Sequence, residues 1–283
     1  MSKAVLITHN DFDGTVCAIL FKAVYPDGVF YLENYDTVDE RIKQVLEEKP
    51  TLLYITDISP QSEEVIEQLD EYWYDKVFLV DHHKTALHLN SFDWAYVRTD
   101  SCAARLFKRT LELGRGPSTP YGKLVFHAND YDLWLHQDPH SAVLNSLLYA
   151  IGHERFINRF LQNPSVELTE TEKYLLEIEQ EKEAKYIQEA VEAAKVYGSF
   201  AVTFAERLAS QIGQKMLETY PVDVAVIVNA QKGVVSLRSK EADISAFAKA
   251  LGGGGHPKAA GFTLPKHLFH DEIADLLMEV WAL

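Results

Sequence analysis

The chain has 283 residues, of which 47% are hydrophobic and 24% are charged, and its formal net charge is −15. These proportions are typical of globular proteins and exclude an intrinsically disordered chain, and the length predicts two domains. The excess of acidic residues argues against the broad basic surface that duplex DNA binding needs. It leaves a small anionic substrate open, because charges more than about 8 Å away are largely screened.

The sequence carries no signal for membrane insertion or secretion. It has no run of about 18 or more apolar residues, and residues 1–7 lead directly into a predicted strand without a signal-peptide pattern. The two cysteines, Cys17 and Cys102, form neither a disulfide framework nor a CxxC pair. These features predict a cytoplasmic protein without a membrane partner.

Segments typical of strands and helices alternate over the first part of the chain. Apolar, β-branched runs predict strands at 4–8, 29–33, 51–56 and 76–80. Apolar residues at helical spacing predict helices at 14–25, 37–48 and 60–73, the last with Ser59 as N-cap and Pro60 as its first residue. This alternation predicts a mainly parallel sheet with helices on both faces, in which ligands bind beyond the carboxyl ends of the strands.

Acidic and imidazole side chains follow three of these predicted strands. His9, Asp11 and Asp13 follow the first strand, Asp57 follows the third, and Asp81, His82 and His83 follow the fourth. Each group alone could be a polar turn or a helix cap, but all three fall on one edge of the sheet, and crowded carboxylates repel unless a cation joins them. Mixed carboxylate and imidazole ligands favour Mn²⁺, Fe²⁺ or Zn²⁺ over Ca²⁺, and their number favours two ions.

The middle of the chain adds one further acidic pair and a long helix. A helix is predicted at 101–113, followed by the Gly/Pro-rich loop 114–120 and by Asp130 and Asp132, which could fold back over the same edge. Other histidines lack such a placement and are expected to be ordinary surface or core residues: His88, His127, His136, His140 and His153. Residues 166–196 show a charged helical pattern without Gly or Pro, which is typical of a helix that connects two domains.

The last part of the chain predicts a smaller α/β module. This part begins with the stretch 199–207, and strand-like or helical patterns occur at 205–219, 222–230, 233–238, 243–251 and 267–282. Between the last two helices, the glycines 252–255 by themselves are typical of a flexible linker. They end in His256 and Lys258, and Arg238 precedes them, so a phosphate-binding site opposite the metals is the alternative.

The motifs, taken together, resemble those of the DHH-family phosphoesterases. "HNDFDG", "TDIS", "DHH" and "YDLW" are similar, in this order, to the four metal motifs of that family, and "SLRS" with "GGGGHPKAAGF" resembles its C-terminal DHH-associated substrate domain. The family includes RecJ-type exonucleases, nano-RNases, nucleotide phosphatases and manganese pyrophosphatases. The resemblance implies a DHH catalytic domain at 1–165, a helical linker at 166–197 and a substrate-binding domain at 198–283.

The resemblance also implies a role for each matched residue. Two Mn²⁺ ions, or other divalent transition metals, would lie between the domains. His9 and Asp11 would hold one ion, Asp13, His82 and Asp132 the other, and Asp57 would bridge them. The implied catalytic residues are Asp57, Asp81, His82 and His83, with His83 facing the substrate phosphate and Asp81 orienting its neighbours. Asp132 is preferred to Asp130 because it precedes Leu133 and Trp134 as the family's aspartate does.

The implied substrate site and activity follow from the same likeness. Arg238, Gly254, Gly255 and His256 would hold the far phosphate or nucleotide. The "YDLW" motif and the short chain resemble the nano-RNase branch, which implies hydrolysis of short single-stranded oligonucleotides from an end with release of 5′-mononucleotides. The alternatives are a 3′,5′-bisphosphonucleotide phosphatase, a cyclic-dinucleotide phosphodiesterase, or a catalytically degenerate nucleotide sensor, which would not need so many ligands. A homodimer is left open.

Overall fold

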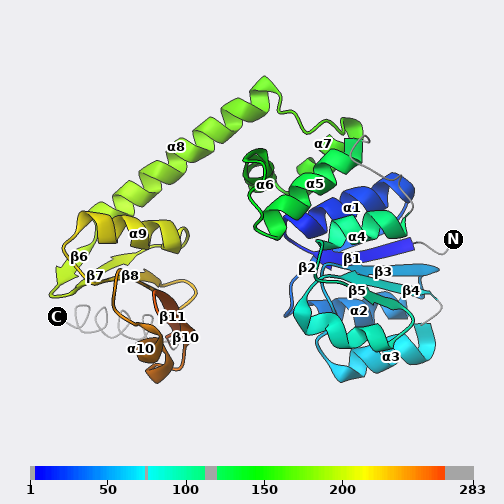
Figure 1. Ribbon diagram of the computed structural model, residues 1–283, viewed down its shortest axis with the longest axis horizontal. Helices are drawn as coiled ribbons and strands as arrows, with labels where there is room; N and C mark the ends of the chain where they lie inside the picture. The colour runs from blue at the N-terminus through cyan, green and yellow to red at the C-terminus, as the bar shows by residue number, and fades with distance from the viewer. Residues whose placement is uncertain (1–3, 74–75, 112–119, 265–283) are drawn as a thin grey trace, which may run out of the picture. The chain divides into compact units, whose positions relative to one another are not determined.

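The computed structural model describes residues 4–73, 76–111 and 120–264, which belong to two compact units (Figure 1). The first unit is Met1–Leu176 and the second is Glu177–Leu283, so the division falls inside the segment predicted as a linker. The predicted loop 114–120, apart from Pro120, and the predicted last helix lie outside the described residues. Within those residues, no helix is long and apolar enough to cross a membrane.

The first unit contains a five-stranded sheet in which every pair of neighbouring strands is parallel. Its strands are β1 (Ala4–His9), β2 (Val29–Glu33), β3 (Leu52–Thr56), β4 (Val77–Asp81) and β5 (Ala95–Val97), in the order β2-β1-β3-β4-β5. The predicted α/β class and the four predicted strands are confirmed. In this order, the strand sequence reverses between β1 and β3, which is where ligands bind in open parallel sheets.

Helices cover both faces of this sheet, as the alternation of strands and helices predicts (Figure 1). One face packs against α1 (Phe12–Val24), α4 (Ala103–Thr110), α5 (Pro120–Asp132), α6 (His140–Ile151) and α7 (His153–Gln162). The other packs against α2 (Val38–Glu47), α3 (Glu63–Trp73) and the 3₁₀ helix η1 (Lys84–Ser91). Successive residues of β1 serve the two cores, since Leu6 lies in the first and Val5 and Ile7 in the second.

The predicted start of the third helix was wrong. The helix α3 begins at Glu63 and not at Pro60. The preceding residues are held by other partners, because Gln61 N donates to Asp39 Oδ1 at 2.7 Å and Gln61 Nε2 donates to the Ser59 carbonyl at 2.8 Å. The first of these bonds ties the segment after β3 to α2, and the helix begins three residues later than predicted.

The second unit contains a mixed six-stranded sheet. Its elements are β6 (Lys195–Tyr197), β7 (Phe200–Phe204), α9 (Ala209–Thr219), β8 (Val224–Asn229), β9 (Val234–Ser239), α10 (Ser245–Ala250), β10 (Gly254–His256) and β11 (Ala259–Thr263). The order is β10-β11-β9-β8-β7-β6, and only β7 and β8 are parallel. The last two glycines of the run, Gly254 and Gly255, therefore belong to a paired strand and not to a flexible linker.

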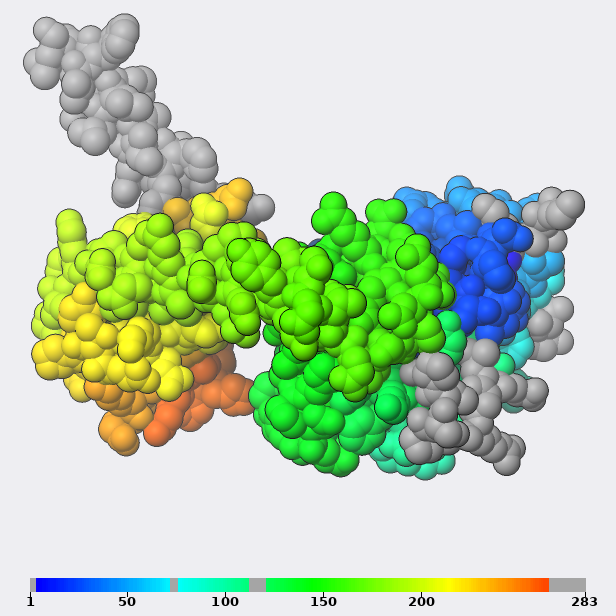
Figure 2. All heavy atoms as spheres, turned by 90° about the horizontal axis from the view of Figure 1, so that it is seen from above, coloured from blue at the N-terminus to red at the C-terminus, as the bar shows by residue number. Residues whose placement is uncertain are grey.

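The helix α8 (Glu170–Glu192) contributes to the core of each unit through one of its ends. Leu176 belongs to the core on the helix-rich face of the first unit, while Ala190 and Val191 belong to the core beneath α9 in the second. Most of its other side chains are exposed, and Figure 2 shows them at the surface. Its charged composition is thus explained by solvation, as expected for a helix with little buried surface.

Candidate metal centre

The turn between β1 and α1 is fixed by Asp11, which caps the helix. Asp11 Oδ1 accepts a hydrogen bond from Gly14 N at 3.0 Å, and Asp11 Oδ2 lies 2.8 Å from His9 Nδ1. Gly14 has no room for a side chain, because a Cβ there would lie 2.0 Å from the His9 carbonyl oxygen. Although burial opposes it, the contact with His9 lowers the pKa of Asp11 to about 2, so this carboxylate is ionised at neutral pH.

Asp13 is buried at the first turn of α1 and faces the N-terminus of α4. Its two carboxyl oxygens accept hydrogen bonds from Ala103 N at 2.6 Å and Ala104 N at 3.0 Å. The start of a helix favours a negative charge at this place. Burial, and after it the neighbouring charge of Asp11, nevertheless raise the pKa of Asp13 to about 6.

Asp57 lies at the centre of the cluster, in the first position after β3. Its side chain is 0% exposed, and its backbone is left-handed, with φ at 60°, which is uncommon for a residue other than glycine. Neither carboxyl oxygen has a hydrogen-bond partner among the described residues. Burial, together with the charges of Asp11 and Asp13, raises the pKa of Asp57 well above its usual value. Such a buried carboxyl is costly unless a cation pairs with it.

The end of β4 supplies two imidazoles and the carboxylate that orients one of them. Asp81 Oδ1 accepts hydrogen bonds from His82 N at 2.7 Å and His83 N at 3.3 Å, and it lies 2.8 Å from His83 Nδ1. Burial lowers the pKa of His82. Burial also opposes protonation of His83, but the bond to Asp81 outweighs it and raises the pKa of His83. The Nε2 atom of His82 lies 3.2 Å from Asp57 Oδ1.

The fourth motif places only Asp132 at this cluster. Asp132 Oδ2 lies 3.3 Å from His82 Nε2, and neither atom has a hydrogen-bond partner among the described residues. Asp130 has a different role, because its oxygens accept from Gln137 N at 2.7 Å, Asp138 N at 3.2 Å and Ser141 Oγ at 2.6 Å. Asp130 thereby anchors the turn that follows α5.

The six predicted metal ligands, joined by His83, fall into three overlapping groups, in each of which one ligand atom per residue lies within 4.8 Å of the others. The groups are His9, Asp11 and Asp57; Asp57, His82 and His83; and Asp13, His82 and Asp132. Asp57 and His82 each belong to two groups, as shared or neighbouring sites require. Buried atoms without hydrogen-bond partners among the described residues occur on Asp57, Asp81, His82 and Asp132. This donor set fits two divalent cations.

Two contacts beside the cluster involve residues that the motifs do not reveal. Thr15 Oγ1 donates to the Asp11 carbonyl and also lies 2.9 Å from His153 Nδ1, so the imidazole must donate through Nδ1 to the hydroxyl. The ring of Tyr35 packs against His9 and His83. No signal in the sequence indicates either contact, because the partners are far apart along the chain.

The predicted substrate residues lie together in the second unit. Cross-strand pairing aligns His256 with Ala259 and Ala259 with Arg238, so the side chains of Arg238 and His256 share one face of the sheet. Arg238 Nη2 donates to Ser210 Oγ at 2.5 Å. A Cβ at Gly255, where φ is 139°, would lie 2.5 Å from the Ala259 carbonyl oxygen, whereas one at Gly254 would meet nothing within 4 Å. Gly255 is therefore needed by the hairpin, and Gly254 leaves open space.

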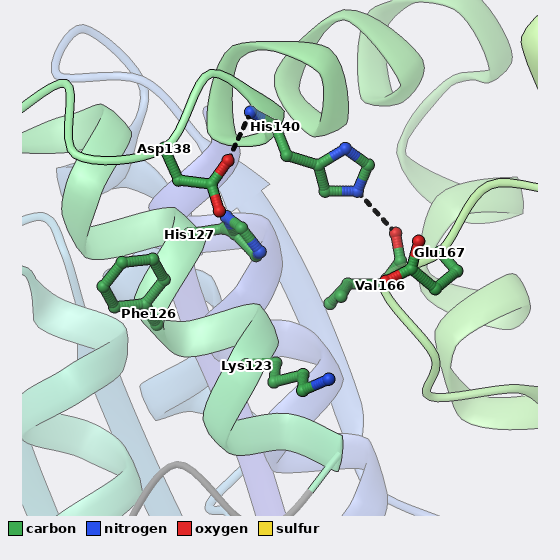
Figure 3. A pocket seen from close by; sticks show the side chains of 7 residues that line it. All are labelled: Lys123, Phe126, His127, Asp138, His140, Val166 and Glu167. Carbon is green, nitrogen blue, oxygen red and sulfur yellow. Dashed lines mark hydrogen bonds between the residues drawn. The ribbon is translucent and has the colours of Figure 1, made fainter.

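A separate pocket in the first unit contains none of the predicted ligands. Its volume is about 470 Å³, and it is lined by Lys123, Phe126, His127, Asp138, His140, Val166 and Glu167 (Figure 3). Its histidines serve the fold, since His127 Nδ1 lies 3.0 Å from Ser141 Oγ and His140 Nε2 lies 2.7 Å from the Val166 carbonyl oxygen. These contacts agree with the prediction that both are ordinary histidines.

Comparison with known proteins places the chain among relatives of matching architecture. Residues 183–283 match the DHHA1 domain family. The chain is 28% identical to the oligoribonuclease NrnB of Bacillus subtilis, over 95% of this chain and 75% of that protein. Two solved structures share its fold, each with a TM-score of 0.55 in an alignment that covers 99% of this chain. They are the pGpG-specific phosphodiesterase PggH of Vibrio cholerae, 16% identical over 99% of that chain, and RecJ of Thermus thermophilus in complex with Mn²⁺, 15% identical over 52% of that chain. These matches confirm the resemblance to the DHH-family phosphoesterases that the motifs predict.

Proposed function

We propose that this protein is a divalent-metal-dependent phosphoesterase that hydrolyses short single-stranded oligonucleotides from an end and releases 5′-mononucleotides. The observation that carries the proposal is the set of buried, unpartnered ligand atoms around Asp57 at the carboxyl edge of the sheet. The relatives named as an oligoribonuclease and as a pGpG-specific phosphodiesterase support this substrate class. They also confirm the predicted enzyme class, a hydrolase that acts on phosphate esters.

The proposed metal ligands follow the three groups of the cluster. His9 and Asp11 hold one ion, Asp13, His82 and Asp132 hold the other, and Asp57 bridges them, which is supported by the position of Asp57 between His9 and His82. Mn²⁺ is the proposed metal because the donors are carboxylates and imidazoles without thiolates. Two such ions, when bound, activate water and offset charge during in-line displacement at phosphorus.

The protein's own residues orient these ligands and the substrate. Asp81 accepts from His83 Nδ1 and from two backbone N–H groups, so the His83 ring is fixed and its Nε2 atom is left for the substrate phosphate or for an ion. The structure groups His83 with Asp57 and His82, so both uses are compatible with its place. Thr15 Oγ1 donates to the backbone carbonyl of Asp11 and is itself bonded to His153 Nδ1, which steadies the first ligand turn.

The second unit is proposed to hold the far end of the substrate. The Arg238 guanidinium and the His256 imidazole lie on one face of the sheet, and both can bind a phosphate group. The open space at Gly254 allows a ligand to approach the backbone there, while Gly255 keeps the hairpin closed. The predicted homodimer, the exclusion of duplex DNA and the cytoplasmic location stay predictions.

A product-resolved assay tests the proposal. The purified protein with MnCl₂ is offered oligonucleotides of about 2–10 nucleotides, a 3′,5′-bisphosphonucleotide and a cyclic dinucleotide, with Asp57→Asn as the inactive control. The expected result is 5′-mononucleotide release that is fastest from the shortest oligomers. Preferred release of inorganic phosphate from the bisphosphonucleotide, or opening of the cyclic dinucleotide, would replace the proposal by one of the two alternatives. No turnover with any substrate would favour a nucleotide sensor.

A further inference from the structure

Tyr35 lies at the rim of the metal centre and has no part in the function proposed above. It follows β2 in a short turn that leads to α2. The turn is fixed by its neighbours, since the Asn34 carbonyl accepts from Thr37 N at 3.1 Å and from Val38 N at 3.0 Å, and Asn34 N donates to Thr37 Oγ1 at 3.1 Å. Tyr35 is therefore held at the carboxyl edge of the sheet, next to the end of β1.

The ring of Tyr35 packs against two imidazoles from different strands. Its centroid lies 5.4 Å from that of His9, which ends β1, and 5.9 Å from that of His83, which follows β4. His9 and His83 belong to two different ligand groups, and these groups share Asp57. The ring is thus beside the place where the two groups meet, which is where a scissile phosphate has to bind.

The exposure and the chemistry of this ring suit a nucleobase better than a second anion. The side chain remains 40% exposed despite its two imidazole contacts, and its hydroxyl has no hydrogen-bond partner in the part of the chain that the structure describes. The neutral phenol ring carries no charge with which to pair an anion, whereas an uncharged base can stack on its face. Aromatic rings are the usual platforms on which single-stranded nucleic acids stack their bases.

We propose that Tyr35 stacks on the nucleobase next to the scissile phosphate and thereby selects nucleotides over other phosphate esters. This inference rests on the proposed function, because it takes an oligonucleotide as the substrate. Every base has a π-face, so the contact is tolerant of sequence and discriminates a nucleotide from an abasic phosphodiester, not one base from another. Since the hydroxyl is not required for stacking, phenylalanine should replace Tyr35 without loss.

The test measures binding of a dinucleotide whose bridging oxygen is replaced by a methylene group, so that it cannot be cleaved. Two further probes lack one base each. The variants are Tyr35→Phe, Tyr35→Leu and a matched control, Tyr96→Leu, because Tyr96 is 42% exposed on β5 and lies outside the cluster. With Mn²⁺ present, Tyr35→Leu should weaken binding of the complete probe about 5- to 100-fold, while the Phe variant and the control bind like the wild type.

The abasic probes show whether the loss comes from a base. The affinity of the wild type for one of the abasic probes should be as low as the affinity of Tyr35→Leu for the complete probe. Tyr35→Leu should not reduce the affinity for that abasic probe further, because the contact between the ring and the base is already absent. An equal effect of Tyr35→Leu on all three probes would overturn the proposal, as would unchanged binding of the complete probe or loss of bound manganese by this variant.

Turnover of the ordinary dinucleotide is measured separately. Base-dependent binding through Tyr35 without any turnover would overturn the proposed hydrolysis alone, and turnover that is indifferent to Tyr35 would overturn this inference alone.

Discussion

Replacing Asp57 by asparagine should stabilise the metal-free protein and at the same time abolish its activity. The Asp57 carboxyl is fully buried, lacks hydrogen-bond partners among the described residues and is close to other acidic groups. Asparagine has nearly the same size, so no cavity forms, but it carries no charge. It also tolerates the left-handed backbone that Asp57 adopts, where φ is 60°.

The expected gain follows from the charge that is removed. An unpaired buried polar group costs about 1–3 kcal/mol and a charged one more, so neutralising Asp57 should raise the free energy of unfolding by about 2 kcal/mol at neutral pH. For a unit of this size, such a change raises the melting temperature by about 4–8 °C. Asp130→Asn is the matched control with the opposite sign, because Asp130 is 2% exposed and its oxygens accept three hydrogen bonds. It should lose about 1–3 kcal/mol.

Thermal denaturation in EDTA and in MnCl₂, followed by the fluorescence of the buried Trp94 in the first unit, measures both effects. Manganese at about a hundredfold excess over its dissociation constant should stabilise the wild type by about 2.7 kcal/mol and leave Asp57→Asn nearly unchanged. The order of stability should therefore reverse between the two buffers. Destabilisation of Asp57→Asn in EDTA, or a full manganese shift in this variant, would refute the reasoning.

Four more outcomes are expected from the same cluster and from the second unit. Asp132→Asn should lose bound manganese in a metal analysis, whereas Asp130→Asn should retain it. Burial and nearby acidic groups raise the pKa of Asp13 and of Asp132 to about 6 from the usual 3.8, so both carboxyl groups bind protons more tightly in the folded protein than in the unfolded one. This difference stabilises the metal-free protein at low pH. Denaturant titrations should therefore show that the free energy of unfolding falls as pH rises from about 4 to 6. In steady-state assays, Arg238→Ala or His256→Ala should raise KM for oligonucleotides about tenfold or more and affect a small aryl phosphodiester much less. With a net charge of −15 and no extended basic track evident in the sequence, kcat/KM should fall beyond about five nucleotides, and a flat or rising profile to about 20-mers would contradict this.

The main sheet could be predicted from the sequence because each of these strands is indicated by the residues of its own segment. β1, β2, β3 and β4 are short β-branched or apolar runs between helical patterns, and each was placed within one or two residues. The strand β10 could not be predicted, because Gly254 and Gly255 have no preference for strands and their pairing with β11 depends on residues elsewhere. No helix is predicted between Asp132 and residue 166, where the structure has α6 and α7.

The candidate site could be predicted in outline because the order and direction of the strands, and not individual side-chain contacts, determine which strand ends lie close together. His9, Asp57 and His82 follow different strands, and the parallel order alone brings them to one edge. The contacts that fix their orientation depend on the folded geometry. The Thr15 and His153 pair is 138 residues apart in the chain, and the Tyr35 ring meets two imidazoles from other strands. The spacing of residues along the sequence does not indicate such contacts.

The choice between Asp130 and Asp132 depends on packing in the folded protein and not on the local sequence pattern. Both residues lie in the last turn of α5, and a separation of two residues turns their side chains to different sides of the helix. The sequence alone does not say which side meets the sheet edge. The structure does, because the turn after α5 folds back on Asp130 and occupies its oxygens, which leaves Asp132 as the carboxylate that reaches His82. The hydrogen bonds of the first aspartate therefore determine that the second is the one available to a metal.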